Sequence, residues 1–219
     1  MKKILFFTFS DKINMQGGQI MFEIIAMLTM FIDHLGIVFF PEQIIFRIIG
    51  RMAFPLYAYA LTQGYKYTSN FNNYCRRLFY LALISQVPYV LLFNTFQLNI
   101  IFTLLICLLL LKLFTQIKNK FYYIPFFLLT GSLEIFQCEY GLYAFLLVLI
   151  YYFNHNIVWR HNFLNIFFLF LRNWSTQLFS FLPSVLIKYC ENRPLEGKAR
   201  NFYRLFYPLH LTLLFLITR

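Results

Sequence analysis

Charged residues are scarce in this sequence, and acidic residues are the scarcest. Only 12% of the 219 residues are charged, with 19 Lys or Arg against 8 Asp or Glu, while 60% are hydrophobic. Typical soluble chains are about 25% charged, so the composition excludes a soluble globular domain. Together with a mean hydropathy of +0.64, it indicates an integral membrane protein embedded in the lipid bilayer.

The sequence also lacks the patterns of several other functions. The four cysteines show no CxxC or Cys-His spacing, so they indicate neither a zinc site nor a disulfide framework. His155 and His161 are on different faces of any helix, and we expect no metal site. No internal repeat and no phosphate-binding motif occurs. The net charge of +11 does not predict a nucleic-acid partner, because bacterial membrane proteins concentrate Lys and Arg in cytoplasmic loops.

Hydrophobic segments of membrane-spanning length follow one another with short polar turns between them. The apolar run within residues 1–21 is too short for a signal peptide, so we expect a cytoplasmic N-terminal tail there. Residues 22–219 are expected to form a single transmembrane domain. Its predicted spans are 22–40, 44–64, 78–93, 98–111, 121–136, 140–153 and 205–218, with the segment 163–190 before the last of them.

The segment 163–190 allows two interpretations. It is either one long span or a hairpin of two short helices that turns at residues 172–175. The hairpin places the basic residues of 188–204 on the same side as the other basic loops, whereas a single span places them opposite. We therefore expect an all-α bundle of nine transmembrane helices, with eight as the alternative. The N-terminus is expected on the cytoplasmic side of the bacterial inner membrane.

Two of these spans carry ionisable side chains, which are costly in a bilayer and usually functional. Asp33 and His34 lie in the first span, and Arg47 and Arg51 lie in the second. At about 1.5 Å per residue, His34 lies about 18 Å from the cytoplasmic end of its helix. Arg51 lies about 10 Å from the other side of a core about 30 Å thick. The two side chains are therefore expected at one level.

Asn99 and Thr103, at the outer end of the fourth span, reach a similar level, and Gly50 would let a neighbouring helix approach closely. A cluster of all these side chains could be catalytic, with His34 as a general base and an Arg stabilising negative charge. Alternatively, Asp33 and an Arg form a buried ion pair that fixes helix packing, and His34 is a bystander.

His210 is a second candidate, with Tyr207 and Arg204 on about the same helical face. Counted from an expected helix start at Leu205, His210 lies about 8 Å from the cytoplasmic face. It would then be separate from His34, either as an interfacial anchor or in a cytosolic vestibule that binds an anionic cofactor. We therefore expect a site reached from the cytoplasm, with His34 at its deep end.

Six motifs occur together in the order and spacing of the TraX family: MLTMFIDHLG, FRIIGRMAFPLYAYALTQGYKYTSN, YCRRL, LNIIFTLL, EYGLYA and FYRLFYPLHL. From about residue 24 to residue 214 the chain resembles this family, which is named after a polytopic inner-membrane protein of F-like conjugative plasmids that N-acetylates pilin. The resemblance implies a site with His34 as catalytic base, Asp33, Arg51 and Asn99 in support, and His210 in its lining.

The expected function is therefore transfer of an acetyl group from acetyl-CoA to an amine or hydroxyl of an envelope acceptor, either a pilin-like protein or a glycan. The acetyl-CoA phosphates would dock on the basic cytoplasmic loops. Residues expected to bind acceptor or cofactor are Arg47, Asn99, Thr103, Tyr207, His210 and Arg204. The alternatives are a transporter or proton-relay channel and a non-catalytic membrane scaffold. Neither the acceptor nor the oligomeric state follows from the sequence.

Overall fold

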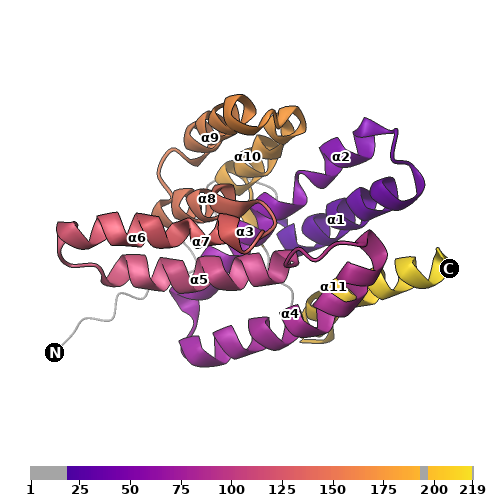
Figure 1. The fold of residues 1–219 in the computed structure, drawn as a ribbon, viewed down its shortest axis with the longest axis horizontal. Helices are drawn as coiled ribbons and strands as arrows, with labels where there is room; N and C mark the ends of the chain where they lie inside the picture. The colour runs from indigo at the N-terminus through magenta and orange to yellow at the C-terminus, as the bar shows by residue number, and fades with distance from the viewer. Residues whose placement is uncertain (1–18, 193–196, 219) are drawn as a thin grey trace.

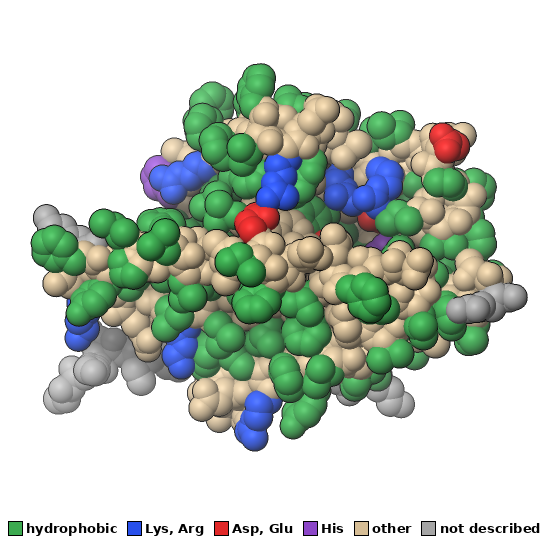
Figure 2. All heavy atoms as spheres, viewed as in Figure 1, with side chains coloured by type: hydrophobic (Ala, Val, Ile, Leu, Met, Phe, Trp, Pro, Cys, Tyr) green, Lys and Arg blue, Asp and Glu red, His purple; other side chains and the backbone are tan. Residues whose placement is uncertain are grey.

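The structure is a computed structural model that describes residues 19–192 and 197–218, so the tail predicted for 1–21 lies mostly outside the described residues. The described chain is almost entirely helical. Three helical stretches are long and apolar enough to cross a membrane: α1 (Phe22–Phe39), α2 and α3 taken together (Ile44–Tyr67), and α4 (Phe71–Phe93). Large hydrophobic side chains lie exposed over much of the face drawn in Figure 2, as expected for a surface that lipid covers. The protein is a helical membrane protein.

Shorter elements complete the bundle drawn in Figure 1. They are α5 (Ile100–Gln116), the 3-10 turn η1 (Lys120–Tyr122), α6 (Tyr123–Thr130), α7 (Ser132–Ile135), α8 (Gly141–Phe153), α9 (Ile157–Arg172), the 3-10 segment η2 (Ser175–Phe181), α10 (Leu182–Tyr189) and α11 (Gly197–Ile217). The two-residue strands β1 (Gln19–Ile20) and β2 (Glu191–Asn192) pair in parallel.

The turns between helices gather at two ends of the molecule. We call one the basic end, formed by the turns near residues 67–71, 116–123 and 153–157. The other, the acidic end, is formed by the turns near residues 39–44, 93–100, 135–141 and 172–175. In Figure 1 the turn between α5 and α6 lies at the left, and the turns after α1 and α4 lie toward the right.

The second predicted span is broken in the structure. Helix α2 (Ile44–Gly50) ends at Gly50, and α3 (Ala53–Tyr67) begins two residues after Arg51. Pro55 gives the reason, because it has no N–H to donate to the carbonyl of Arg51, four residues earlier. The break places Arg51 at a kink in the middle of the hairpin, facing α1.

Close packing of α1 on α2 depends on glycine. A Cβ atom at Gly50 would overlap the side chain of Asp33, and one at Gly36 would overlap Phe46. The expectation that Gly50 lets a neighbouring helix approach is therefore confirmed, and the helix that approaches is α1.

Two predicted helix starts were wrong by about seven or eight residues. Helix α4 begins at Phe71 rather than residue 78, because the side chain of Asn70 caps it by accepting the N–H of Asn73 at 2.9 Å. Helix α11 begins at Gly197 rather than Leu205. Because β1 precedes α1 and β2 precedes α11, the parallel β1–β2 pair brings the starts of these two helices to the same end of the molecule.

The segment 163–190 forms the predicted hairpin. Helix α9 ends at Arg172, the chain turns at Asn173 with φ of 55°, and η2 and α10 return along α9. A buried hydrogen-bond network ties this hairpin to α8: His161 Nδ1 lies 2.6 Å from Ser184 Oγ, and His161 Nε2 lies 2.9 Å from Tyr143 Oη. Tyr151, Asn165, Gln177 and Ser180 complete the network. The Asn165 amide nitrogen is buried without a partner among the described residues, but the hydrogen bonds that do form link α8, α9, η2 and α10 and help to fix their positions.

Candidate functional site

An ion cluster joins α1 to α2 at the kink. Arg47 Nη1 donates to both carboxylate oxygens of Asp33, each at 2.9 Å, and Arg51 Nη2 donates to Asp33 Oδ2 at 3.2 Å. The Asp33 side chain is 11% exposed and that of Arg51 is 13% exposed, whereas Arg47 keeps 35% of its side chain exposed. One buried carboxylate therefore holds two guanidinium groups in place.

His34 does not contact this cluster through a hydrogen bond; its partner is His210 on α11. His34 Nδ1 lies 2.7 Å from His210 Nε2, and the two rings stack with their centroids 5.0 Å apart. Both residues are buried. Tyr207 packs its ring edge-on against both imidazoles.

The hydrogen bonds of His210 determine the tautomer of His34. His210 Nδ1 lies 2.8 Å from the backbone carbonyl of Phe206, which can only accept, so Nδ1 carries the hydrogen. In the neutral ring Nε2 is then an acceptor, and the hydrogen in the 2.7 Å bond belongs to His34 Nδ1. His34 is left with a lone pair on Nε2, a nitrogen that no hydrogen bond to a described residue occupies. A neutral imidazole with a free, oriented lone pair is what a general base requires.

His34 lines a cavity of about 410 Å³, which we call the histidine cavity. The ion cluster lines it as well, so the free base and two guanidinium groups face one space. The remaining lining comes from the turns of the acidic end and from the last turns of α1 and α4: Ile37, Tyr89, Phe93, Thr95, Gln97, Glu139, Tyr140 and Trp174. An isolated bridge between Leu98 and Cys138 holds two of these turns together.

Two features set the electrostatics of the histidine cavity. Arg51 Nε is buried without a hydrogen-bond partner, and the guanidinium lies over the Tyr140 ring, 5.4 Å from its centroid. Glu139 lies in the turn before α8. Burial raises the pKa of Glu139 to about 7, against the opposing effect of Arg51, so near neutral pH this carboxyl is only partly ionised. A side chain that lines the cavity thus keeps one N–H donor without a partner among the described residues, in the same lining as the free base of His34.

A second cavity, of about 490 Å³, lies on the other side of the histidine pair, and we call it the tyrosine cavity. Its lining begins at Met30, one turn before His34, and at Tyr207, whose ring contacts His34. From there it extends toward the starts of α4 and α11, with Arg77 and Arg204 among its polar side chains. Tyr57, Tyr74, Tyr80 and Tyr203 also line it, among aliphatic residues. Tyr207 therefore links the tyrosine cavity to the histidine pair.

The structure corrects the predicted position of His210. The distance from Gly197 to His210 is about 20 Å along the helix, close to the 18 Å or so from Phe22 to His34. Because α1 and α11 start at the same end, the two histidines meet at one level. His210 is part of the His34 site, and of the three residues placed in a separate vestibule only Tyr207 and Arg204 line the tyrosine cavity.

The histidine cavity opens at one end of the bundle, which bears on the predicted entry from the cytoplasm. The cavity that His34 lines is formed by turns of the acidic end, opposite the basic loops. Entry from the basic end, as predicted, would have to pass through a different space, the tyrosine cavity.

Asn99 and Thr103 do not complete the cluster. Asn99 caps α5, accepting the N–H groups of Ile101 and Phe102 at 3.0 and 3.2 Å, and its amide donates to the carbonyl of Ala82 at 2.8 Å. Thr103 is fully buried one turn later. Neither residue lines the histidine cavity. Asn99 instead holds the turn after α4 against that helix.

Sequence reasoning missed several residues that line the histidine cavity, including Glu139, Tyr140 and Trp174. A signal was present for the first two, which stand in the EYG motif. No sequence signal distinguishes Trp174, because it enters the cavity only through the turn between α9 and η2. Among the described residues, no group of His, Cys, Asp and Glu forms a metal site.

The ion cluster predicts a large stability effect. Asp33→Asn would leave two guanidinium groups without a buried counter-charge, and breaking a buried pair in this way typically costs about 3 to 5 kcal/mol. We expect a loss of this order in the free energy of unfolding, measured by denaturant titration of the purified protein in detergent.

The matched control is Glu134→Gln. Glu134 pairs with Arg172, but both side chains are more than a third exposed, at 37% and 38%. Exposed pairs contribute about 0 to 1 kcal/mol, and Gln keeps the oxygen that accepts the N–H of Leu142. Equal losses for the two variants would show that the Asp33 cluster does not stabilise the fold.

Comparison with known proteins identifies the family of the chain. Residues 19–218 match the family model described as TraX protein. A probable fimbrial assembly protein FimC, serogroup H1, of Dichelobacter nodosus is 23% identical over 237 residues, covering 92% of this chain and 96% of that protein. An uncharacterised protein of Rickettsia prowazekii (strain Madrid E) is 31% identical over 83 residues, which cover 38% of this chain and 32% of that protein. No solved structure matches the chain. Because the family model covers nearly the whole chain, the protein belongs to the TraX family.

Proposed function

We propose that this protein is a membrane acetyltransferase that moves an acetyl group from acetyl-CoA to an amine or hydroxyl of an envelope acceptor. The observation that carries the proposal is the His34–His210 pair, which leaves a free Nε2 lone pair on His34 in a cavity shared with two guanidinium groups. A transfer of this kind needs a base for the acceptor proton and positive charge for the oxyanion.

The proposed step is a direct transfer. His34 Nε2 takes the proton of the acceptor N–H or O–H as the acceptor heteroatom bonds to the thioester carbonyl carbon. The carbonyl oxygen becomes negative and is stabilised by the spare Nε–H of Arg51, which Asp33 holds in position. When the carbon–sulfur bond breaks, the imidazolium returns its proton to the leaving thiolate, so the products are the acetylated acceptor and CoA thiol.

The two cavities suggest how the substrates approach. The tyrosine cavity extends from Met30 and Tyr207 toward the starts of α4 and α11, and Arg77 and Arg204 line it. Two guanidinium groups suit the phosphates of acetyl-CoA, and an elongated, largely apolar space suits its pantetheine arm. The acceptor would enter the histidine cavity at the acidic end. By the positive-inside rule the basic end faces the cytoplasm, where acetyl-CoA is made.

Family membership gives the acceptor a context. The matched relative from Dichelobacter nodosus is named as a fimbrial assembly protein. We therefore place this chain in pilus or fimbrial assembly, with a pilin-like protein as the first acceptor to test and an envelope glycan as the second. Localisation in the bacterial inner membrane with the N-terminus in the cytoplasm belongs to the same proposal.

The test is an assay with the purified protein in nanodiscs and acetyl-CoA labelled with ¹⁴C in the acetyl group. Label is expected in a peptide with a free N-terminal amine or in a glycan acceptor. A reaction without an acceptor is the control and should give no acetylated product. If label transfers to no acceptor and no thioester is hydrolysed, the proposal is wrong.

The same two cavities would also suit a proton-coupled transporter, in which the histidine pair relays protons between opposite ends. Proteoliposomes distinguish the two functions. A transporter acidifies or alkalinises the lumen when a gradient is imposed and needs no acetyl-CoA. The acetyltransferase produces no such pH change.

A further inference from the structure

A groove far from the histidine pair runs between α8 and the first half of α9. It has a volume of about 570 Å³, and its lining is apolar except for one residue, Arg160. Leu146, Leu149, Ile150 and Phe153 come from α8, and Trp159, Phe163 and Leu164 come from α9. Trp159 is 73% exposed and Phe163 is 64% exposed, so the groove opens outward, where the apolar surface of the bundle meets lipid. Its length along α8 is about 10 Å.

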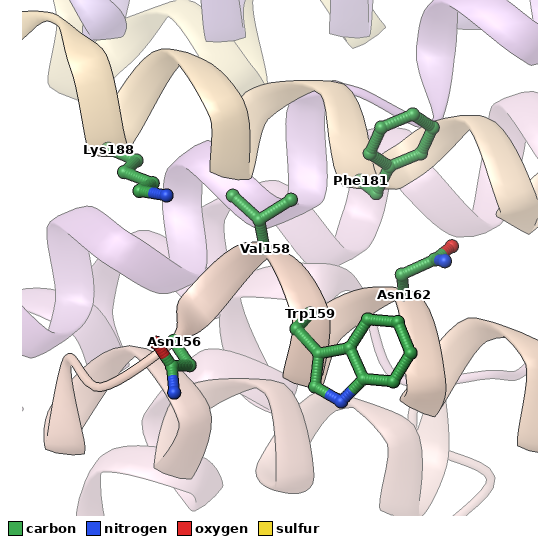
Figure 3. A pocket seen from close by; sticks show the side chains of 6 residues that line it. All are labelled: Asn156, Val158, Trp159, Asn162, Phe181 and Lys188. Carbon is green, nitrogen blue, oxygen red and sulfur yellow. The ribbon is translucent and has the colours of Figure 1, made fainter.

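On the other side of Trp159 lies a smaller hollow of about 280 Å³, drawn in Figure 3. Trp159 and Asn162 come from α9 and Asn156 from the turn before it, and Phe181 and Lys188 face them from η2 and α10. Trp159 therefore lines two neighbouring hollows, each with one basic side chain in its lining: Arg160 in the groove and Lys188 in the smaller hollow. Neither hollow is lined by Asp or Glu, and neither cation forms an ion pair with a residue in the described part of the chain.

The start of α9 adds a third feature at the same place. Asn156 precedes the helix with φ of 48°, and its side chain makes no capping hydrogen bond. The first N–H groups of the helix therefore lack a side-chain acceptor, and the positive end of the helix dipole lies beside both cations. Helix N-termini of this kind bind phosphate groups readily.

We propose that this surface binds an anionic glycerophospholipid. One acyl chain lies in the apolar groove between α8 and α9, and the phosphate lies at the start of α9 between Arg160 and Lys188. The exposed indole of Trp159 lies at the level of the headgroup, where tryptophans concentrate in membrane proteins. Charge complementarity selects the lipid, because both cations and the helix dipole favour a net negative headgroup over a zwitterionic one.

The experiment uses the two tryptophans of the chain. In a Trp174→Phe variant, Trp159 is the single tryptophan, and excitation at a wavelength that tyrosine does not absorb makes it the only emitting residue. The protein is placed in vesicles of phosphatidylcholine that contain increasing fractions of bromine-labelled phosphatidylglycerol or, separately, bromine-labelled phosphatidylcholine. We expect half-maximal quenching of Trp159 at a lower fraction of labelled phosphatidylglycerol than of labelled phosphatidylcholine. The difference should be about fivefold for each of the two cations.

The double substitution Arg160→Gln with Lys188→Gln should abolish this preference and leave quenching by phosphatidylcholine unchanged. The control is Arg76→Gln with Lys118→Gln, which removes the same charge from exposed positions on α4 and in the turn after α5. It should retain the preference. Equal quenching by both lipids, or loss of the preference in the control as well, overturns the proposal in favour of ordinary lipid contact or a general surface charge effect. Absence of quenching by either lipid also overturns it, because the groove is then covered by protein.

Discussion

Replacement of His34 is expected to abolish acetyl transfer while the protein stays folded. His34→Ala removes the Nε2 base, and His34→Gln keeps a side chain of similar reach that can donate to His210 Nε2 but cannot take a proton. General-base catalysis typically contributes about 10²- to 10⁴-fold, so we expect both variants to lose at least about a hundredfold in kcat. The measurement is the rate of labelled acetyl transfer by purified protein.

Two comparisons make this result interpretable. His155→Ala changes an exposed histidine in the turn before α9 and should keep full activity. Thermal unfolding should show that His34→Gln retains a single cooperative transition near that of the parent protein. If His34→Gln transfers acetyl at the parent rate, His34 is not the base, and the ion cluster must act without it.

The second large effect concerns His210, which we expect to act as a positioning residue through His34. His210 Nε2 accepts the Nδ1 hydrogen of His34, and this fixes the lone pair on the other nitrogen. His210→Gln supplies an amide oxygen that can accept the same hydrogen, whereas His210→Met is of similar size and supplies no oxygen or nitrogen acceptor. We expect His210→Gln to keep activity within about tenfold and His210→Met to lose about a hundredfold or more in kcat.

This pair of variants separates three roles of His210. If His210 only fills space, Gln and Met will both keep activity close to that of the parent protein. If His210 must itself take the proton, Gln will be as inactive as Met, because an amide does not titrate. A ¹⁵N spectrum of histidine-labelled protein gives a readout without any acceptor: His34 should be protonated on Nδ1 in the parent and in His210→Gln, and should populate both tautomers in His210→Met.

The sequence by itself determined the class of the protein and the identity of its unusual side chains. Scarce charge and long apolar runs require a helical membrane protein, because only helices and closed barrels satisfy the backbone inside a bilayer. The positions of Lys and Arg also identified the hairpin within 163–190, because the net charge of a loop can be read directly from its residues. Ionisable residues in apolar helices are costly, so Asp33, His34 and Arg51 were recognisable as a candidate site. Depth counting predicted that α1 and α2 bring them to one level, and Asp33 does pair with Arg51.

Only the tertiary structure decided how that site works. The sequence placed His210 near the membrane surface because its helix was expected to start at the last apolar stretch; the structure extends α11 back to Gly197 through polar residues and aligns it with α1. Asn99 was expected in the cluster, but it caps α5, because a helix start with free N–H groups recruits a nearby amide oxygen. Hydrophobic pattern records which residues avoid water, whereas contacts between residues 176 positions apart depend on how whole helices pack. The pairing of His34 with His210, and the opening of its cavity at the acidic end, are properties of that packing alone.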